Sequence, residues 1–217
     1  MKKKFLLSGF FFALFVVLAV LLKTVNVAPV GPMGSSVGLS YANRAFFNRF
    51  GTNDTWDKIT AVCLLICIVT AVLFALLGLV QLVRRKKLAK VDKEIFALAG
   101  LYAVMMVFYV LFEKFVINCR PVLEADGTLE ASFPSTHTLI SCVVMGSALL
   151  LSRKYIKNEK LGSIFRICCV LLMIVTPLGR ILAGKHWFTD VFGGYLLSGS
   201  LLVAFWGVLD GLKKVKN

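Results

Sequence analysis

Acidic residues and histidines are scarce in this 217-residue chain, which has 11 Asp and Glu, 25 Lys and Arg, and two His. A hydrolytic site for two metal ions needs a cluster of acids and histidines, and the sequence contains no acid-rich cluster. The long apolar stretches also lack the alternation of polar and apolar residues that is typical of a half-buried strand. The scarcity of acids therefore argues against a metal-dependent site, and the missing alternation argues for helices.

The six cysteines do not have the spacing of a disulfide framework or of a metal site. Cys63 and Cys67 share a helical face, but no pair of histidines or acids accompanies them. Only Cys119 approaches an outer loop, whereas five cysteines lie inside predicted spans: Cys63, Cys67, Cys142, Cys168 and Cys169. We interpret these five as small apolar residues. No metal ion and no cofactor is predicted.

Long hydrophobic runs dominate what the chain does contain. Hydrophobic residues make up 59% of the chain, a larger fraction than in soluble domains, and the mean hydropathy is +0.84. About 20 apolar residues cross a bilayer as a helix, and in lipid only helices or closed barrels satisfy every backbone group. We predict an all-α, polytopic membrane helical bundle with about six transmembrane helices, over residues 5–22, 60–83, 95–116, 137–152, 164–179 and 190–210.

The first run admits two interpretations, because it follows MKKK. A cleaved signal peptide has the same basic start and apolar centre. No clear small-x-small cleavage site follows the run, so a retained first span is favoured. The sequence shows no internal repeat and no linker long enough to separate domains, and residues 1–217 are predicted to form a single membrane-embedded unit.

The net charge of +14 is explained by how basic residues are distributed between loops. One set of alternate loops, together with the two termini, carries 17 Lys and Arg, and the other set carries 8. The positive-inside rule places the first set, and both termini with it, in the cytoplasm. The surplus would also attract anionic lipid of the inner leaflet. The bilayer is therefore an expected partner and nucleic acid is not, while the oligomeric state stays open.

The longest polar segment, residues 23–59, is predicted to be an outer loop. It is rich in Gly, Ser and Asn, and it contains the aromatic stretch AFFNRF. This stretch fits a short interfacial helix lying along the membrane, and it fits an ordinary loop equally well.

The stretch GRILAGKHWFTD, residues 179–190, gathers charged groups between two apolar runs on the outer side. His186 and Asp190 are four residues apart and would share a helix face. A carboxylate that accepts one imidazole N–H leaves the other nitrogen free to act as a base, a nucleophile or a metal ligand. Arg180 would come from the end of the preceding span, where Gly184 allows a turn, and its guanidinium suits a bidentate grip on phosphate. The alternative is an interfacial His–Asp pair beside a snorkelling arginine.

The stretch FPSTHT, residues 133–138, contains the other histidine on the same predicted side. Pro134 suits the first turn of a helix and Ser135 or Thr136 suits its cap, so the fourth span would begin beside His137. The free N–H groups of a helix N-terminus form a ready anion site. On its own, this stretch is more simply a capped helix start with an incidental histidine.

Lys114 and the pair Arg120-Pro121 lie in the same outer loop as this helix start. Arginine just beyond a span is often an interfacial anchor. Together, however, the three segments supply two Arg, two His, one Asp, one Lys and hydroxyl caps. This set matches an oxyanion that is held while one histidine attacks and the other protonates.

The three segments resemble the signature of the type 2 phosphatidic acid phosphatase superfamily, which includes membrane lipid phosphatases and vanadium haloperoxidases. That signature reads Lys-x6-Arg-Pro, Pro-Ser-Gly-His and Ser-Arg-x5-His-x3-Asp, and the stretches here read EKFVINCRP, PSTH and GRILAGKHWFTD. The resemblance covers about residues 95–210, which leaves residues 1–94 as two additional spans and an outer loop.

The chain departs from the signature at three positions. Glu113 stands at the expected lysine position, because only five residues separate Lys114 from the Arg-Pro pair. Thr136 replaces the glycine of the signature, and Gly179 replaces its first serine. Both histidines and the aspartate are in place, so activity is expected.

The resemblance implies the role of each site residue. His186 would attack phosphorus and become a phosphohistidine, Asp190 would fix its tautomer, and His137 would protonate the leaving group and then activate water. The residues implied to bind the phosphate are Arg120, Arg180, Ser135, Thr136 and, from a locally shifted turn, Lys114.

The predicted function is a lipid phosphatase of the plasma membrane that hydrolyses a phosphate or pyrophosphate monoester at the outer face. Such substrates include phosphatidate, phosphatidylglycerophosphate and polyprenyl pyrophosphates such as undecaprenyl pyrophosphate. Two alternatives stay open: a lipid phosphotransferase that uses the same histidine, and a non-catalytic membrane protein.

Overall fold

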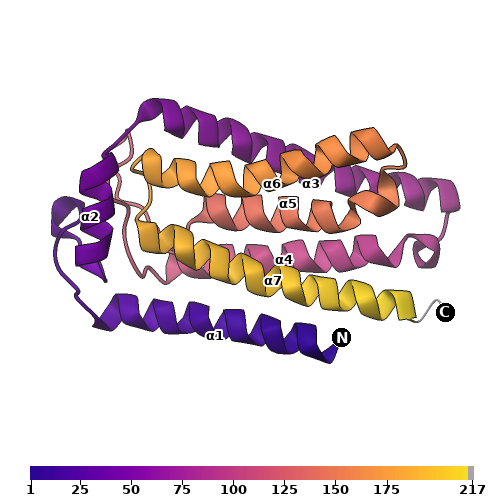
Figure 1. Cartoon of the computed structure of the whole chain (residues 1–217), viewed down its shortest axis with the longest axis horizontal. Coiled ribbons are helices and arrows are strands. Elements are labelled where there is room, and N and C mark those ends of the chain that lie inside the picture. The colour runs from indigo at the N-terminus through magenta and orange to yellow at the C-terminus, as the bar shows by residue number, and fades with distance from the viewer. Residues whose placement is uncertain (215–217) are drawn as a thin grey trace.

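The computed structural model describes residues 1–214 and is all-helical over that range (Figure 1). Six of its helices are long and apolar enough to cross a membrane, and each contains most of one predicted run. The six-span prediction is therefore confirmed, and polar flanks extend the two shortest runs to helices of 20 and 24 residues. The elements are α1 (Lys2–Thr24), η1 (Pro32–Gly34), α2 (Ser40–Phe50), α3 (Asp54–Arg85), η2 (Leu88–Lys90), α4 (Lys93–Lys114), α5 (Thr136–Tyr155), α6 (Glu159–Leu182) and α7 (Phe188–Lys214).

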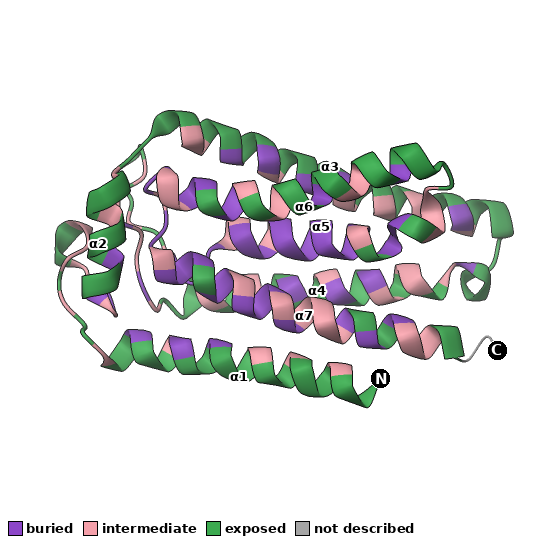
Figure 2. Ribbon diagram, in the orientation of Figure 1, coloured by how far each residue is buried: buried purple, intermediate pink, exposed green. Residues whose placement is uncertain are grey.

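Helix α5 is the centre of the bundle, and α3, α4, α6 and α7 all contact it. Its small residues, such as Ser141, Gly146 and Ala148, let these neighbours approach closely. Figure 2 shows α5 as mostly buried, whereas α1 lies at the edge along α7 and is mostly exposed. The least apolar span is thus the one that other helices shield, and the most exposed spans present apolar side chains outward, as contact with lipid requires.

The start of α1 and the end of α7 lie at the same end of the bundle (Figure 1), as an even number of spans requires. Lys4 of α1 forms an ion pair with Asp210 of α7 at this end. The loops that hold most of the basic residues, which join α3 to α4 and α5 to α6, lie here too. The opposite end carries both histidines, His137 at the start of α5 and His186 in the connection from α6 to α7.

The aromatic stretch of the first loop is a helix, α2, which lies across the end of the bundle opposite the termini (Figure 1). The Phe46 ring stacks on Phe188 of α7 with centroids 4.3 Å apart. The buried Asn43 donates from its side-chain amide to the Thr189 hydroxyl at 2.9 Å and to the Gly38 carbonyl oxygen at 2.9 Å. The first loop therefore holds the start of α7 in place.

A polar cluster ties three helices together at the end where the chain termini lie. The Asp92 carboxylate, before α4, accepts hydrogen bonds from Gln81 and Arg85 of α3 and from Tyr155 of α5, at 2.9 to 3.1 Å. Lys154 of α5 pairs with the same carboxylate at 3.1 Å. Burial opposes ionisation of Asp92, but these cationic and hydrogen-bonding partners outweigh it and hold its pKa below the usual range.

Asp92→Asn is expected to lower the melting temperature of the protein in detergent by about 3–6 °C near neutral pH, because charge-assisted hydrogen bonds are lost. A carboxylate with a lowered folded-state pKa stabilises the fold fully above the pKa of an unfolded Asp and loses this effect as pH falls through the folded value. The difference in melting temperature between wild type and variant should therefore become smaller as the pH drops below about 4. Lys157→Gln, at an exposed position of the same end, serves as the control and should leave the melting temperature unchanged. Equal melting temperatures for Asp92→Asn and wild type would contradict the role of the cluster.

Candidate active site

Two helix starts bring the two histidines together. His137 lies in the first turn of α5, whose N-terminus is capped by Ser135, and the Ser135 hydroxyl accepts from the Thr138 N–H at 3.4 Å. His186 lies in the connection from α6 to α7, and its ring centroid is 6.4 Å from that of His137. The Ser135 backbone N–H donates to the Asp190 carbonyl oxygen at 2.9 Å, which fixes the start of α5 against the start of α7.

The connection that holds His186 is a tight turn. Helix α6 ends at Leu182, and Gly184 has a φ of +67°, a left-handed conformation that glycine adopts without steric cost. Helix α7 begins only at Phe188, so His186 precedes it and does not share a helix face with Asp190 as the spacing predicts. The turn nevertheless places the His186 Nδ1 atom 3.7 Å from the Asp190 Oδ2 atom.

Asp190 is fully buried and its carboxylate is held in place. Its Oδ2 atom accepts from the Trp187 backbone N–H at 2.9 Å, and the Trp187 indole N–H donates to the Cys119 carbonyl oxygen at 2.7 Å. The carboxylate thus faces Nδ1 of His186 and leaves Nε2 as the nitrogen available for chemistry.

His186 is suited to nucleophilic attack because its ring is kept neutral. Its side chain is only 1% exposed. Burial lowers the pKa of His186 well below the usual histidine value, and the positive charges of Arg180 and Arg120 lower it further. An unprotonated imidazole nitrogen is therefore present at neutral pH.

Arg180 lies in the last turn of α6 and is 3% exposed. It donates to the Asp57 carboxylate of α3 at 2.5 Å and to the Thr60 hydroxyl at 3.2 Å. Gly179, beside it, packs against Trp56 and Thr60, and a side chain there would collide with Thr60. The absence of a side chain at 179 therefore brings Arg180 close to its partners on α3.

Arg120 lies in the loop between α4 and α5, where the backbone of residues 118–120 pairs with that of residues 130–132. Its guanidinium forms ion pairs with Glu124 and, at 2.9 Å, with Glu130. Glu124 also pairs with Lys185 at 3.0 Å. Burial opposes ionisation of Glu124, but Lys185 and Arg120 outweigh it and lower its pKa. Each guanidinium of the site is thus oriented by an acid. The sequence did not predict the four residues that orient the two arginines, which are Asp57, Thr60, Glu124 and Glu130.

Several buried polar atoms at this place have no hydrogen-bond partner within the part of the chain that the structure describes. Leaving such atoms unpaired is costly, and their grouping at one point is typical of a place where a ligand supplies the partners. Three of the side chains, Arg120, Arg180 and His137, can donate to an oxyanion. The atoms are Nε of Arg120, Nε of Arg180, Nδ1 of His137, both ring nitrogens of His186, and Oδ1 of Asp190.

The two predicted hydroxyl ligands of the phosphate, Ser135 and Thr136, occupy different environments from each other. Ser135 is fully buried, and its hydroxyl accepts from Thr138 while its N–H is bonded to Asp190, so both groups already serve to join α5 to α7. Thr136 lines a pocket of about 590 Å³ together with His137 and Arg120. Thr136 is therefore the hydroxyl residue that faces the pocket.

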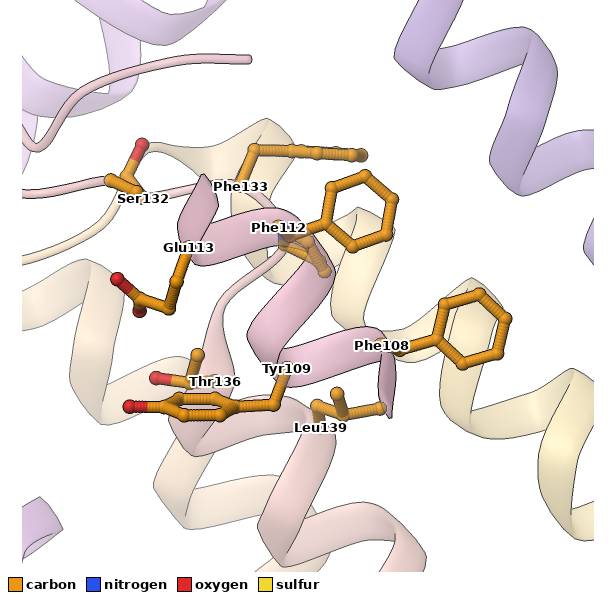
Figure 3. Close-up of a pocket in the computed structure, with 10 residues that line it drawn as sticks. Phe108, Tyr109, Phe112, Glu113, Ser132, Phe133, Thr136 and Leu139 are labelled. Atoms are coloured by element: carbon orange, nitrogen blue, oxygen red, sulfur yellow. The ribbon is translucent and has the colours of Figure 1, made fainter. Parts of the chain in front are cut away.

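The structure does not bring Lys114 to the site. Lys114 is the last residue of α4 and lies along an apolar groove with Val110, Leu111 and Phe115. Glu113, one position earlier on the helix, lines the pocket instead. Figure 3 shows the Glu113 carboxylate on the same side of α4 as the hydroxyl groups of Tyr109 and Thr136, with Phe108, Phe112 and Phe133 on the other side.

The fold is that of a polytopic helical membrane protein, and one end of the bundle carries a cluster of His, Asp and Arg side chains. Within residues 1–214, no three His, Cys, Asp or Glu side chains are grouped so that they could hold a metal ion. Residues 94–213, more than half of the chain, match the PAP2 superfamily, and the chain belongs to this superfamily. The match confirms the predicted family.

Two individual proteins support this assignment. A dihydrosphingosine 1-phosphate phosphatase of Schizosaccharomyces pombe is 35% identical over 94 residues, which are 42% of this chain and 23% of that protein. The chain thus matches about a quarter of the length of this relative. The crystal structure of a transmembrane PAP2-type phosphatidylglycerolphosphate phosphatase from Bacillus subtilis matches with a TM-score of 0.69 and 16% identity, covering 94% of this chain and 96% of that one. The structural match confirms the transmembrane fold.

Arg180→Lys is expected to lower kcat/KM for phosphate release by about 10²-fold, because an ammonium group cannot replace the planar, multidentate guanidinium at an oxyanion. Arg166→Lys, the same substitution elsewhere on α6, is the control and should leave kcat/KM unchanged. The measurement is initial-rate phosphate release in detergent. Equal rates for Arg180→Lys and Arg166→Lys would show that Arg180 serves only the packing of α6 on α3.

Proposed function

We propose that the protein is a membrane lipid phosphatase that works through a phosphohistidine at His186. The observation that carries this proposal is the set of unpaired, buried polar atoms around two facing histidines and two arginines. A phosphoryl group has oxygens for both guanidinium groups and a phosphorus atom for a nucleophile. Positioning and charge stabilisation supply most of what phosphoryl transfer requires, and the site offers both.

In the first half-reaction, Nε2 of His186 attacks phosphorus, the N–P bond forms and the bond to the lipid oxygen breaks. The Asp190 carboxylate, 3.7 Å from Nδ1, stabilises the positive charge that develops on the ring. His137 lies on the pocket side of His186. In its protonated form it donates a proton to the lipid oxygen as that oxygen leaves, and it becomes neutral. Arg120 and Arg180 neutralise the charge on the phosphoryl oxygens.

In the second half-reaction, His137 takes a proton from water, and the resulting nucleophile attacks the phosphohistidine. The N–P bond breaks, phosphate leaves, and His186 returns to its neutral form. In this mechanism the protein needs no metal ion and no cofactor.

The shape of the pocket supports a lipid as the substrate. Leu64 of α3, Met106 of α4 and Ile140 of α5 form its apolar part, and Arg120 and His137 form its polar part. An amphiphile could place its head group on the polar part while its tails follow the apolar part into the bilayer. Dihydrosphingosine 1-phosphate and phosphatidylglycerolphosphate, in the names of the two similar proteins, are lipids of this kind. Phosphatidate and polyprenyl pyrophosphates such as undecaprenyl pyrophosphate are further candidates.

The proposed location is the outer face of the plasma membrane. The argument is the charge distribution: the histidine-bearing loops lie opposite the loops and termini that carry most basic residues. On this assignment both termini are cytoplasmic, and the lipid head group is hydrolysed on the extracytoplasmic side.

The test is phosphate release by purified protein in detergent with a chelator present. Phosphatidate, phosphatidylglycerophosphate, sphinganine 1-phosphate and a polyprenyl pyrophosphate would be offered in parallel. We expect release from at least one of them at a rate that the chelator does not change. Transfer of phosphate to glycerol or another alcohol in place of water would instead identify a phosphotransferase, and no release from any of these lipids would contradict the proposal.

A further inference from the structure

Glu113 is the feature of the pocket that the proposed mechanism does not use. It lies in the last turn of α4, one turn after Tyr109, and lines the same pocket as Arg120 and His137. In Figure 3 its carboxylate and the hydroxyl groups of Tyr109 and Thr136 point to one side. A carboxylate, a phenol and an aliphatic hydroxyl therefore face the polar part of the pocket together.

Glu113 differs from the other acids of the site in having no partner. Asp57 pairs with Arg180, and Glu124 and Glu130 pair with Arg120. Glu113 is an exposed residue that lines the pocket, and within residues 1–214 it makes no hydrogen bond and no ion pair. The other acids thus orient the guanidinium groups, and the charge of Glu113 is left for whatever enters the pocket.

A free carboxylate is unfavourable beside a site for a dianion. At separations of about 8 Å and an effective dielectric constant near 20, the repulsion is enough to weaken binding of a plain phosphate ester by tenfold or more. The same charge becomes favourable when the substrate carries a cation next to its phosphate. The phosphate of such a substrate would then lie at the arginines and its cation at Glu113, so that each charge lies next to one of opposite sign.

We propose that Glu113 binds a primary ammonium group of the substrate, so that the preferred substrates are lipid phosphate monoesters with an amine close to the phosphate. An ammonium group donates three hydrogen bonds, and the Glu113 carboxylate and the hydroxyl oxygens of Tyr109 and Thr136 provide three acceptors. This inference rests on the proposed phosphatase function, and it adds a subsite and a substrate class to it.

The experiment compares two lipids that differ at the amine, which is charged in one and acetylated in the other. Sphinganine 1-phosphate carries an ammonium group on the carbon next to the phosphate-bearing carbon, and N-acetyl-sphinganine 1-phosphate keeps the chain and the phosphate but loses the charge. We expect wild-type kcat/KM to be at least about tenfold higher for the ammonium lipid. Glu113→Gln should lower kcat/KM for the ammonium lipid by about tenfold and leave that for the N-acetyl lipid equal or higher, which removes the preference.

Two further variants separate the subsite from general effects of charge and folding. Asp54→Asn removes one negative charge from an exposed position at the same end of the bundle, outside the pocket, and should keep the wild-type preference. Glu113→Lys should reverse the preference, because a cation at this place attracts the uncompensated phosphate. Reversal needs a folded, active enzyme, so misfolding cannot imitate it.

The outcomes that overturn the inference differ from those that overturn the phosphatase function. Equal loss of both activities in Glu113→Gln, a wild-type preference for the N-acetyl lipid, or no release from the ammonium lipid would each refute the ammonium subsite. Phosphate release from phosphatidate would at the same time leave the phosphatase function standing. If no lipid phosphate is hydrolysed at all, both proposals fail.

Discussion

Replacing His186 with alanine is expected to lower kcat for phosphate release by about 10⁴-fold or more. The reason is that the proposed reaction passes through a bond to this residue, and other groups of the site cannot take its place. The side chain is buried beside Asp190, so the substitution removes both the nucleophile and the partner of that carboxylate. The measurement is single-turnover phosphate release in detergent, for which even very slow rates are accessible.

His186→Asn provides the matched variant, because it keeps a polar side chain next to Asp190 and still lacks an imidazole. The same loss is expected for it. Both variants should retain the elution profile of wild type in size-exclusion chromatography, which shows that the bundle is intact. Activity within tenfold of wild type in either variant would rule out the phosphohistidine mechanism.

Replacing His137 with alanine is expected to lower steady-state turnover by about 10³-fold and to reveal the intermediate. His137 serves both half-reactions, but a substrate with a good leaving group, such as a nitrophenyl phosphate, does not need a proton donor in the first. The variant should therefore release nitrophenol in a rapid burst and then remain phosphorylated, because water is no longer activated. Quenching in alkali, where phosphohistidine survives and phosphoserine esters are distinguishable, gives the labelled protein.

The position of the label is part of this prediction. Mass spectrometry of the quenched His137→Ala protein should find phosphate on the peptide that contains His186. The double variant that also lacks His186 should show neither burst nor label. A burst followed by label elsewhere would contradict His186 as the nucleophile. No burst with the activated substrate would assign His137 a role other than water activation.

The fold was predictable because the membrane imposes a simple rule on sequence. An apolar run of about 20 residues has few structures open to it in lipid, and each run is one helix in the structure. Boundaries were less accurate, because polar residues such as Asp54 and Glu159 continue a helix beyond the hydrocarbon layer. Hydrophobicity alone does not mark where such a helix ends.

The candidate site was predictable where its residues lie close together in sequence. The spacing of Arg180, His186 and Asp190 placed these three correctly near one another, although the histidine lies in a turn and not on the helix. Long-range pairs, such as Arg180 with Asp57, depend on how α3 packs on α6. The local spacing of residues carries no information on this packing. Neighbouring positions on a helix also differ in direction by about 100°, which is why Glu113 faces the pocket and Lys114 does not.

The contacts that the first loop and α3 make with the site limit how far the chain can be shortened from its N-terminus. The part of the chain that matches the family, residues 94–213, contains both histidines, the aspartate and both arginines. The groups that hold Thr189 and Arg180 in position, Asn43 and Asp57, lie before it. A fragment cut at the family boundary would keep the residues proposed to react and lose Asn43 and Asp57, so we expect residues 1–93 to be required for activity.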